Sequence, residues 1–389
     1  MRILFDFKTT QSFVGGASEY TRRVFYTLLD IIEERKLNVE LIGLIDSRVK
    51  NFAYPDLSPD SLNKYNIDII DIANKNLKDI IISQSIDKIF IGCGQTWNKF
   101  DLHNINIPVI CVIHDIWNEE FFTNHLDDLL LLNHGLWYLL KHRLKLIIKR
   151  TNLLSNNKQL IEMIHRNSNS VLVTVSEFSR LSISYAYGIP PHNIKVLYSP
   201  YRMNRVSAEI ENNDLRTLIS KGIRYYLMLS ANRRNKNAYK AFKAFEQYVR
   251  QVDPNAILVT TGCHNRKFDN HICMPYLSES DLVYAMKNCY ALIFPSIFEG
   301  FGYPPVEAMS FGKPVLVSNT SSIPEVCKEA AIYFSPFFES DIYRSLVLLD
   351  EKSYSSYQNK AQKRFQELKM KQESDLIELI ELILHDSDN

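Results

Sequence analysis

Apolar runs alternate with longer amphipathic segments through the first half of the chain. The runs have the length and composition of buried strands, and the segments between them have helical period. This alternation is typical of a parallel sheet covered by helices. We therefore predict a helix over residues 17–34 and strands over residues 3–7, 39–45, 88–91, 109–113 and 171–175.

The same alternation restarts after Ser199-Pro200 and a polar stretch near residues 209–213. Residues 354–384 are charged and helical in period. At 389 residues the chain exceeds the size at which one core keeps growing. The pattern predicts an α/β protein of two domains, over 1–200 and 201–365. The second domain has predicted strands over 225–229, 256–260, 291–294 and 315–317.

Composition narrows the class of protein. The formal net charge is +1, from 45 basic and 44 acidic side chains, which argues against nucleic-acid binding through bulk charge. No run approaches the roughly 18 apolar residues of a spanning helix, and residues 1–6 have the pattern of a strand rather than of a signal peptide. We expect a cytoplasmic protein with reduced thiols and no disulfides.

One group of possible metal ligands stands out: Cys263, His264, His271 and Cys273. Two sulfurs and two imidazoles within a short segment suggest a zinc site. Usual structural zinc sites separate paired ligands by two to four residues, however, and Cys263 and His264 are adjacent. The spacing favours a surface loop with incidental histidines over a zinc site.

Glu299 and Glu307 are separated by the seven residues GFGYPPV. The two glycines permit positive φ and close backbone approach, and the two prolines suit a first helical turn, so the segment predicts a turn that opens a short helix. Gly312 and Pro314 end this helix. A helix N-terminus favours an anion, and carboxylates suit sugar hydroxyls, so a nucleotide sugar fits here. The alternative is that the carboxylates only cap and solvate a helix.

The segment PSIFEGFGYPPVEAMSFGKPVLVSNTSSIPEV, residues 295–326, resembles the donor-site signature of family 4 glycosyltransferases. Further matching pieces follow in the order of that family: 15–17 (GGA), 114–115 (HD), 175–179 (VSEFS), 188–190 (GIP), 236–237 (KN) and 276–296. The resemblance implies the GT-B fold, with two Rossmann-like domains facing across a cleft. It also implies a last helix, 366–389, that crosses back onto the N-terminal domain.

Breaking a glycosidic phosphate bond requires cations and N–H groups beside the leaving group. By resemblance, Lys236 binds the diphosphate, with Arg233 or Arg234 assisting. The Arg usual in the family five residues earlier is Ala231 here. A solvated loop is the alternative for these bases.

His114 and Asp115 end a predicted strand, where open α/β sheets place ligands. The resemblance implies that His114 contacts the transferred sugar, Glu299 its hydroxyls and Glu307 the ribose, although a structural histidine is an alternative for His114. The catalytic residues expected are thus Glu299, His114 and Lys236. The expected donor-binding residues are Gly15, Gly16, Arg233, Arg234, Lys236, Tyr276, Leu277, Gly300, Phe301, Gly302 and Glu307.

Gly15-Gly16 precedes the first predicted helix, so its amides could reach the phosphate from the N-terminal domain. No G-x-G-x-x-G stands there, which argues against an NAD-dependent dehydrogenase. Ser176 is expected to cap the helix after the strand at 171–175. No Asp-x-Asp follows a predicted strand, so we expect activity without an essential metal ion or cofactor.

Residues 134–150 form a basic amphipathic pattern, which suits either a core-packed helix or contact with an anionic inner-membrane surface. Aromatic residues in the N-terminal loops are candidates for stacking on a glycan or lipid acceptor: Phe13, Trp97, Trp117, Phe121 and Phe122.

The sequences of residues 300–309 (GFGYPPVEAM) and 318–326 (SNTSSIPEV) resemble mannosyl- and deoxyhexosyl-transferases of bacterial surface polysaccharide pathways. We therefore expect a retaining hexosyltransferase that uses GDP-mannose and a glycan or lipid-linked glycan acceptor. The alternatives are a UDP-sugar transferase, a catalytically silent scaffold subunit, and an epimerase or phosphorylase on the same fold.

Overall fold

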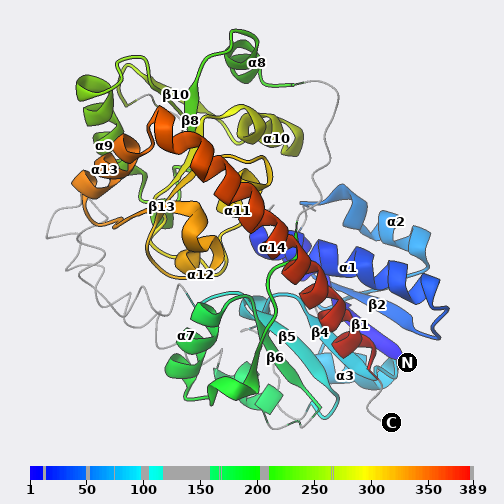
Figure 1. Ribbon diagram of the computed structural model, residues 1–389. Helices are drawn as coiled ribbons and strands as arrows, with labels where there is room; N and C mark the ends of the chain where they lie inside the picture. Colours follow the sequence, from blue (N-terminus) through cyan, green and yellow to red (C-terminus); the bar gives the residue numbers. More distant parts are fainter. Residues whose placement is uncertain are drawn as a thin grey trace, which may run out of the picture. The chain divides into compact units, whose positions relative to one another are not determined.

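The computed structural model describes residues 1–11, 15–49, 53–73, 75–97, 105–116, 158–165, 167, 169–201, 210–263, 265 and 267–385. The chain divides into two compact units (Figure 1). Among the described residues, unit 1 draws on residues 1–116, 158–201 and 372–385, and unit 2 on residues 210–371. Each unit contains one sheet of parallel strands, and the two are described separately.

The sheet of unit 1 has the order β3-β2-β1-β4-β5-β6-β7. Every neighbouring pair in it is parallel. The chain order reverses between β1 and β4, which makes this the topological switch point of the sheet. The strands are β1 Arg2–Asp6, β2 Glu40–Ile45, β3 Asp68–Asp71, β4 Lys88–Ile91, β5 Val109–Ile113, β6 Val171–Thr174 and β7 Ile194–Val196.

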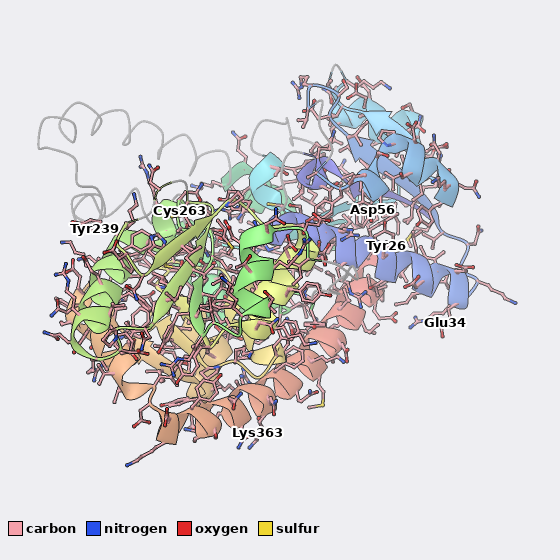
Figure 2. The ribbon with its side chains drawn as sticks, turned by 90° about the horizontal axis from the view of Figure 1, so that it is seen from above. Tyr26, Glu34, Asp56, Tyr239, Cys263 and Lys363 are labelled. Carbon is pink, nitrogen blue, oxygen red and sulfur yellow. The ribbon has the colours of Figure 1, made fainter. Side chains whose placement is uncertain are left out.

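The α-helices described in unit 1 are α1 Gly16–Glu34, α2 Pro59–Leu62, α3 Leu77–Ser83 and α7 Glu177–Tyr187. Its 3-10 turns are η1 Lys8–Thr10, η2 Pro55–Leu57, η3 Asn63–Tyr65, η4 Gly94–Trp97 and η5 Pro191–Asn193. Helix α1 buries one face, and its Phe25 packs edge-on against Phe5 of β1. Asp56 of η2 accepts hydrogen bonds from Arg22 and Tyr26 of α1 at 2.8 Å each, and these contacts tie the turn to the helix (Figure 2).

The sheet of unit 2 has the order β10-β9-β8-β11-β12-β13, again with parallel pairs throughout. Its switch point lies between β8 and β11. The strands are β8 Tyr225–Met228, β9 Ile257–Thr261, β10 His271–Met274, β11 Ala291–Phe294, β12 Val315–Ser318 and β13 Ala331–Phe334. The α-helices are α8 Asn213–Ser220, α9 Ala238–Gln251, α10 Glu279–Asn288, α11 Tyr303–Ser310, α12 Ile323–Cys327 and α13 Glu339–Leu348, with 3-10 turns η6 Arg234–Lys236 and η7 Lys328–Ala330.

Helix α14, Glu351–Leu384, belongs to both units (Figure 1). In unit 2, Arg364 donates to the carbonyl of Val326 at 2.8 Å. In unit 1, Gln372 donates to the carbonyl of Ser199 at 2.6 Å, and Asp375 accepts the Tyr198 N–H at 2.8 Å. The predicted return of the C-terminal helix to the N-terminal part of the chain is therefore confirmed.

Two Rossmann-like units with parallel sheets confirm the predicted α/β fold class. All the predicted strands are present, within a residue or two of their expected ends. Four further strands were not predicted, and all four are edge strands: β3, β7, β10 and β13. Within the described residues, none of the helices combines the length and the apolar character needed to cross a bilayer. Residues 134–150 lie outside the described part of the chain.

Candidate functional site

Two loops meet at the switch point of unit 2. One loop follows β8 and contains Lys236, and the other follows β11 and contains Glu299. Because β8 and β11 are neighbours, their carboxyl ends lie side by side at the sheet edge where such folds bind ligands. The Lys236 ammonium Nζ lies 2.5 Å from Glu299 Oε1. The structure thus brings together two of the three catalytic residues expected from the sequence.

The loop after β8 is held in place by the neighbouring strand β9. The amide of Ser230 donates to Thr261 Oγ1 at 3.0 Å, and the amide of Ala231 donates to the Thr261 carbonyl at 2.9 Å. Lys236 ends this loop in η6 and is only 6% exposed. Its ammonium also lies 4.3 Å from the centroid of the Phe294 ring, so an apolar wall helps to fix the cation.

One oxygen of Glu299 receives several hydrogen bonds. Besides Lys236, Ser296 Oγ donates to Oε1 at 2.5 Å and Asn235 Nδ2 donates to it at 3.3 Å. Among the described residues, all these bonds reach Oε1, which leaves Oε2 to accept a bond from a ligand hydroxyl. Charge-assisted bonds of this kind hold a carboxylate in one orientation before a ligand arrives.

The backbone of Glu299 is clamped by the segment after β12. The Glu299 N–H donates to Ser321 Oγ at 3.0 Å, and Ser322 Oγ donates to the Glu299 carbonyl at 2.9 Å. Ser318 Oγ bonds the carbonyl of Ser296 in the same way. We name these three residues, Ser318, Ser321 and Ser322, the serine clamp. The sequence analysis did not predict this clamp, although Ser318 ends β12, the strand adjacent to β11, and Ser321 and Ser322 follow it.

Helix α11 begins after Gly302, which has a φ of 95°. A Cβ at this position would lie 2.5 Å from Ile323 Cδ1, so glycine is required for both conformation and space. Gly300, in contrast, is not in the left-handed region. Pro304 and Pro305 carry no N–H, so the donors at this helix start are the amides of Gly302 and Tyr303. The N-terminus therefore supplies fewer donors than a typical helix would.

The other expected donor-binding residues of unit 2 differ in exposure. Glu307 lies in α11 and is only 5% exposed, and Phe301 is buried edge-on against Tyr303. Tyr276 is 54% exposed, and its hydroxyl donates to Asn232 Oδ1 at 2.6 Å. Leu277 is half-buried, while Arg233 and Arg234 are exposed on the loop that carries Lys236.

His114 lies in unit 1, directly after β5. Its ring Nε2 donates to the carbonyl of Gly92 at 2.9 Å, and the ring edge packs against Tyr20 at a centroid distance of 4.8 Å. Burial lowers the pKa of His114 to about 4, and the bond to Gly92 only partly opposes that shift. The ring is therefore neutral at physiological pH, which leaves Nδ1 with the lone pair.

Gly15 and Gly16 open helix α1 of unit 1. Gly15 is the N-cap residue in an extended conformation, and Gly16 is the first helical residue. Their position at a helix start agrees with a role for backbone amides. Ser176 caps α7 as predicted, since its Oγ accepts the Ser179 N–H at 3.1 Å.

Trp97 was expected as a candidate for stacking on the acceptor, and that prediction is wrong. The side chain is 0% exposed, its Nε1 donates to Asp6 Oδ2 at 2.5 Å, and the Lys8 ammonium lies 3.6 Å from its ring centroid. Trp97 is therefore a buried residue that packs over the Asp6 and Lys8 side chains at the switch point of unit 1. The other candidates, Phe13, Trp117, Phe121 and Phe122, lie outside the described residues.

The prediction of incidental histidines around Cys263 is also wrong for His271. This residue lies in β10, is 1% exposed, and has ligand atoms within 4.8 Å of those of Cys263 and Cys273. The four residues HICM form an edge strand here, which the sequence analysis did not predict. His264 lies outside the described residues.

Comparison with known proteins agrees with this geometry. Residues 209–364 match the family model of glycosyl transferases group 1, a segment that contains Lys236, Glu299 and the serine clamp. This match confirms the resemblance to glycosyltransferases inferred from residues 295–326.

Two relatives and one solved structure illustrate the similarity. The chain is 41% identical over 81 residues to the serotype-specific mannosyltransferase WbdA of Escherichia coli, covering 20% of this chain and 10% of that protein. It is 27% identical over 189 residues to the O-antigen chain mannosyltransferase RfbU of Salmonella typhimurium, covering 46% and 50%. The fold matches Anabaena HepE, solved in complex with UDP and glucose, with a TM-score of 0.65, 15% identity and coverage of 99% and 98%. The aligned segments thus span half or less of these curated relatives.

Proposed function

We propose that the protein is a retaining glycosyltransferase that moves a hexose from a nucleotide sugar to a glycan or lipid-linked glycan. The observation that carries this proposal is the Lys236–Glu299 pair at the switch point of unit 2, 2.5 Å apart and fixed by Ser296 and the serine clamp. A preorganised cation beside a preorganised carboxylate fits a substrate with a phosphate next to sugar hydroxyls.

The proposed roles follow from the chemistry of each group. Lys236 stabilises the charge that grows on the leaving diphosphate, helped by the amides of Gly302 and Tyr303 and by Arg233 or Arg234. Glu299 Oε2 accepts bonds from hydroxyls of the transferred sugar, and Glu307 binds the ribose. His114, as a neutral ring, contacts the sugar without adding charge beside the developing oxocarbenium ion.

The proposed reaction proceeds with retention. The acceptor hydroxyl attacks the face from which the diphosphate departs, and an oxygen of that diphosphate takes the proton. Lys236 supplies positive charge at the leaving group, so we expect no essential divalent metal and no cofactor. Transfer that persists in excess EDTA would agree, and loss of transfer restored by Mg²⁺ would contradict it.

GDP-mannose is the donor proposed first, since the two curated relatives named above are mannosyltransferases. The second candidate is a UDP-sugar, because HepE, with the same fold, was solved with UDP and glucose. A bacterial surface polysaccharide is the proposed product, by analogy with the O-antigen chain named for RfbU. The proposed location of the reaction is the cytoplasm.

A thermal-shift panel with GDP, UDP, GDP-mannose and UDP-hexoses tests the proposal, because a ligand that binds the native state raises the melting temperature. We expect a shift with one nucleotide class that is lost in Lys236→Ala and in Glu307→Ala. The matched control is Lys243→Ala, which removes an exposed lysine of α9 and should keep the shift. If wild type shows no shift with any nucleotide, the transferase proposal fails and a silent scaffold subunit replaces it.

A further inference from the structure

Two cysteines lie side by side in unit 2. Cys263 follows β9 and Cys273 lies in β10, and their sulfur atoms are 3.1 Å apart (Figure 2, where Cys263 is labelled). In the strand register Cys273 pairs with Thr260, not with Cys263. A left-handed turn at Gly262, with a φ of 70°, redirects the chain so that the Cys263 amide reaches the carbonyl of Met274 at 3.4 Å. The fold itself therefore creates this sulfur pair.

The pair differs from the other cysteines in exposure. Cys263 and Cys273 are half-buried, whereas the remaining four are between 0% and 8% exposed: Cys93, Cys111, Cys289 and Cys327. Strand β10 is also an edge strand, so among the described strands only β9 pairs with it and its outer side is not covered by another. Thiol chemistry depends on access by the reagent, so this pair is the reactive one among the six cysteines.

His271 does not complete a metal site with these sulfurs. Its Nδ1 accepts the Lys267 N–H at 3.1 Å, and its Nε2 bonds Thr260 Oγ1 at 2.8 Å. The ring is also packed against Phe242 and Phe268. With both ring nitrogens engaged, this group offers a metal two sulfurs only. The sulfur atoms, in contrast, need to approach by only about 1 Å to form a disulfide.

We propose that Cys263 and Cys273 form a reversible disulfide by exchange with a low-molecular-weight disulfide. The Cys263 thiolate attacks one sulfur of that reagent, which forms a mixed disulfide and releases one small thiolate. Cys273 then attacks Cys263 Sγ, and the second small thiolate leaves. The two thiol protons pass to the two departing thiolates, so two protein thiols are oxidised and one small disulfide is reduced.

The order of attack follows from the surroundings of Cys273. Burial and the hydrogen bond with Cys263 raise the pKa of Cys273 to about 11, so Cys273 remains protonated at neutral pH. The thiolate is the nucleophile in such exchange, so the raised pKa disfavours attack by Cys273 on the reagent. Cys263, whose sulfur lies in an exposed contact with the Asn265 carbonyl, is therefore assigned to capture the reagent, and Cys273 to resolve the mixed disulfide.

Formation of the disulfide should alter the donor site through a displacement of Gly262. A Cβ on Gly262 would lie 2.9 Å from the Tyr276 ring and 3.0 Å from Asn232 Oδ1, so there is little space between this turn and both side chains. Drawing Cys263 toward Cys273 displaces the adjacent Gly262 and with it Tyr276. This consequence rests on the proposed function, in which Tyr276 and Leu277 lie beside the nucleotide base.

The protein is reduced, freed of reductant and treated with oxidised glutathione. It is then digested under denaturing conditions with its remaining thiols blocked. We expect the loss of two of the six thiols and a peptide pair joined through Cys263 and Cys273. Cys263→Ser and Cys273→Ser should each abolish the linkage, whereas Cys289→Ala, which removes a buried thiol, should retain it. A chain that keeps all six thiols, or that carries only a stable mixed disulfide, would overturn the proposal.

The thermal shift given by the nucleotide is then compared for the oxidised and reduced protein. A smaller shift after oxidation, restored by dithiothreitol and absent in Cys263→Ser, is the expected result. Equal shifts in both forms would refute the coupling to the donor site while leaving the disulfide intact. No shift in either form would instead refute the proposed function, so the two failures are distinguishable.

Discussion

The switch points of the two sheets each place a lysine beside a carboxylate. In unit 2, Lys236 and Glu299 come from loops after different strands, 2.5 Å apart, and the Glu299 side chain is 16% exposed. In unit 1, Lys8 and Asp6 come from one segment at the end of β1, 3.4 Å apart, and the Asp6 side chain is 0% exposed. One pair thus keeps an oxygen for a ligand, whereas the other is closed beneath Trp97.

The difference shows what a switch point needs in order to bind a ligand. Topology places both pairs at the same edge of a Rossmann-like sheet, so topology alone does not define a site. In unit 1 the Trp97 ring covers the cation, and burial lowers the pKa of Lys8 to about 8 despite the nearby Asp6. In unit 2, small hydroxyl side chains bond Glu299 Oε1 and the Glu299 backbone, and among the described residues these bonds leave Oε2 to a ligand. The following variants test this contrast.

The largest effect is expected for Trp97→Ala. Removing a fully buried indole leaves a cavity and takes a donor from Asp6, so the free energy of unfolding should fall by about 3–5 kcal/mol. Urea unfolding followed by circular dichroism measures the loss. Tyr185→Ala is the control, because that aromatic side chain in unit 1 is 92% exposed and should change stability by less than about 0.5 kcal/mol. Equal, small effects of both variants would contradict a structural role for the unit 1 switch point.

Lys236→Ala should reduce turnover by roughly 10²–10³-fold, because the leaving diphosphate loses its preorganised cation. The melting temperature without nucleotide should change little, in contrast to Trp97→Ala. Release of nucleoside diphosphate in the presence of acceptor measures turnover, with Lys243→Ala as the control. A variant that unfolds without losing turnover per folded molecule would assign Lys236 to structure instead.

His114 should make stability depend on pH in a window set by its pKa. The native ring stays neutral down to about pH 4, while the unfolded chain takes up its proton near 6.5. The unfolded state therefore binds more protons between these values, and stability falls as the pH drops from about 6.5 to 4. The loss should be roughly 2 kcal/mol, since part of the residue reaches solvent.

Urea midpoints measured across this pH range for wild type, His114→Asn and His192→Asn test that prediction. His114→Asn should flatten the dependence, whereas His192→Asn removes an exposed histidine and should leave it unchanged. If the two variants behave alike, His114 does not carry the predicted shift.

Ser296→Ala should have the smallest effect. It removes one of the hydrogen bonds that orient Glu299, worth about 1.5 kcal/mol for a charged acceptor, which corresponds to a fall in kcat/KM of roughly tenfold. Ser220→Ala, on an exposed position of α8, is the control. The melting temperature should not change. A fall in stability that matches the fall in activity would contradict this prediction and indicate a packing role for Ser296.

The central strands and the ends of α11 could be predicted from the sequence because both leave local patterns. Buried strands such as β5 are continuous apolar runs, and Gly302 with two following prolines marks a helix start. The edge strands could not be predicted in this way. Strands β3 and β10 are short and carry polar residues, because one edge of each has no neighbour in its sheet.

Only the two charged residues of the candidate site, Lys236 and Glu299, could be predicted from the sequence. Lys236 and Glu299 belong to recognisable segments, but the bonds from Ser296, Ser321 and Ser322 depend on three loops meeting in space. The burial of Trp97 could not be predicted for a related reason, because the sequence around an aromatic residue in a loop does not indicate whether that residue is buried. His271 was hidden by the polar sequence around it.

Isothermal titration of the nucleotide selected by the thermal-shift panel into wild type, Lys236→Ala and Lys243→Ala tests the central claim most directly. If the switch point of unit 2 binds the donor, the wild type and Lys243→Ala should bind with equal affinity, and Lys236→Ala should bind at least tenfold more weakly with an unchanged melting temperature. Equal affinity of all three proteins would contradict the account and place the nucleotide elsewhere.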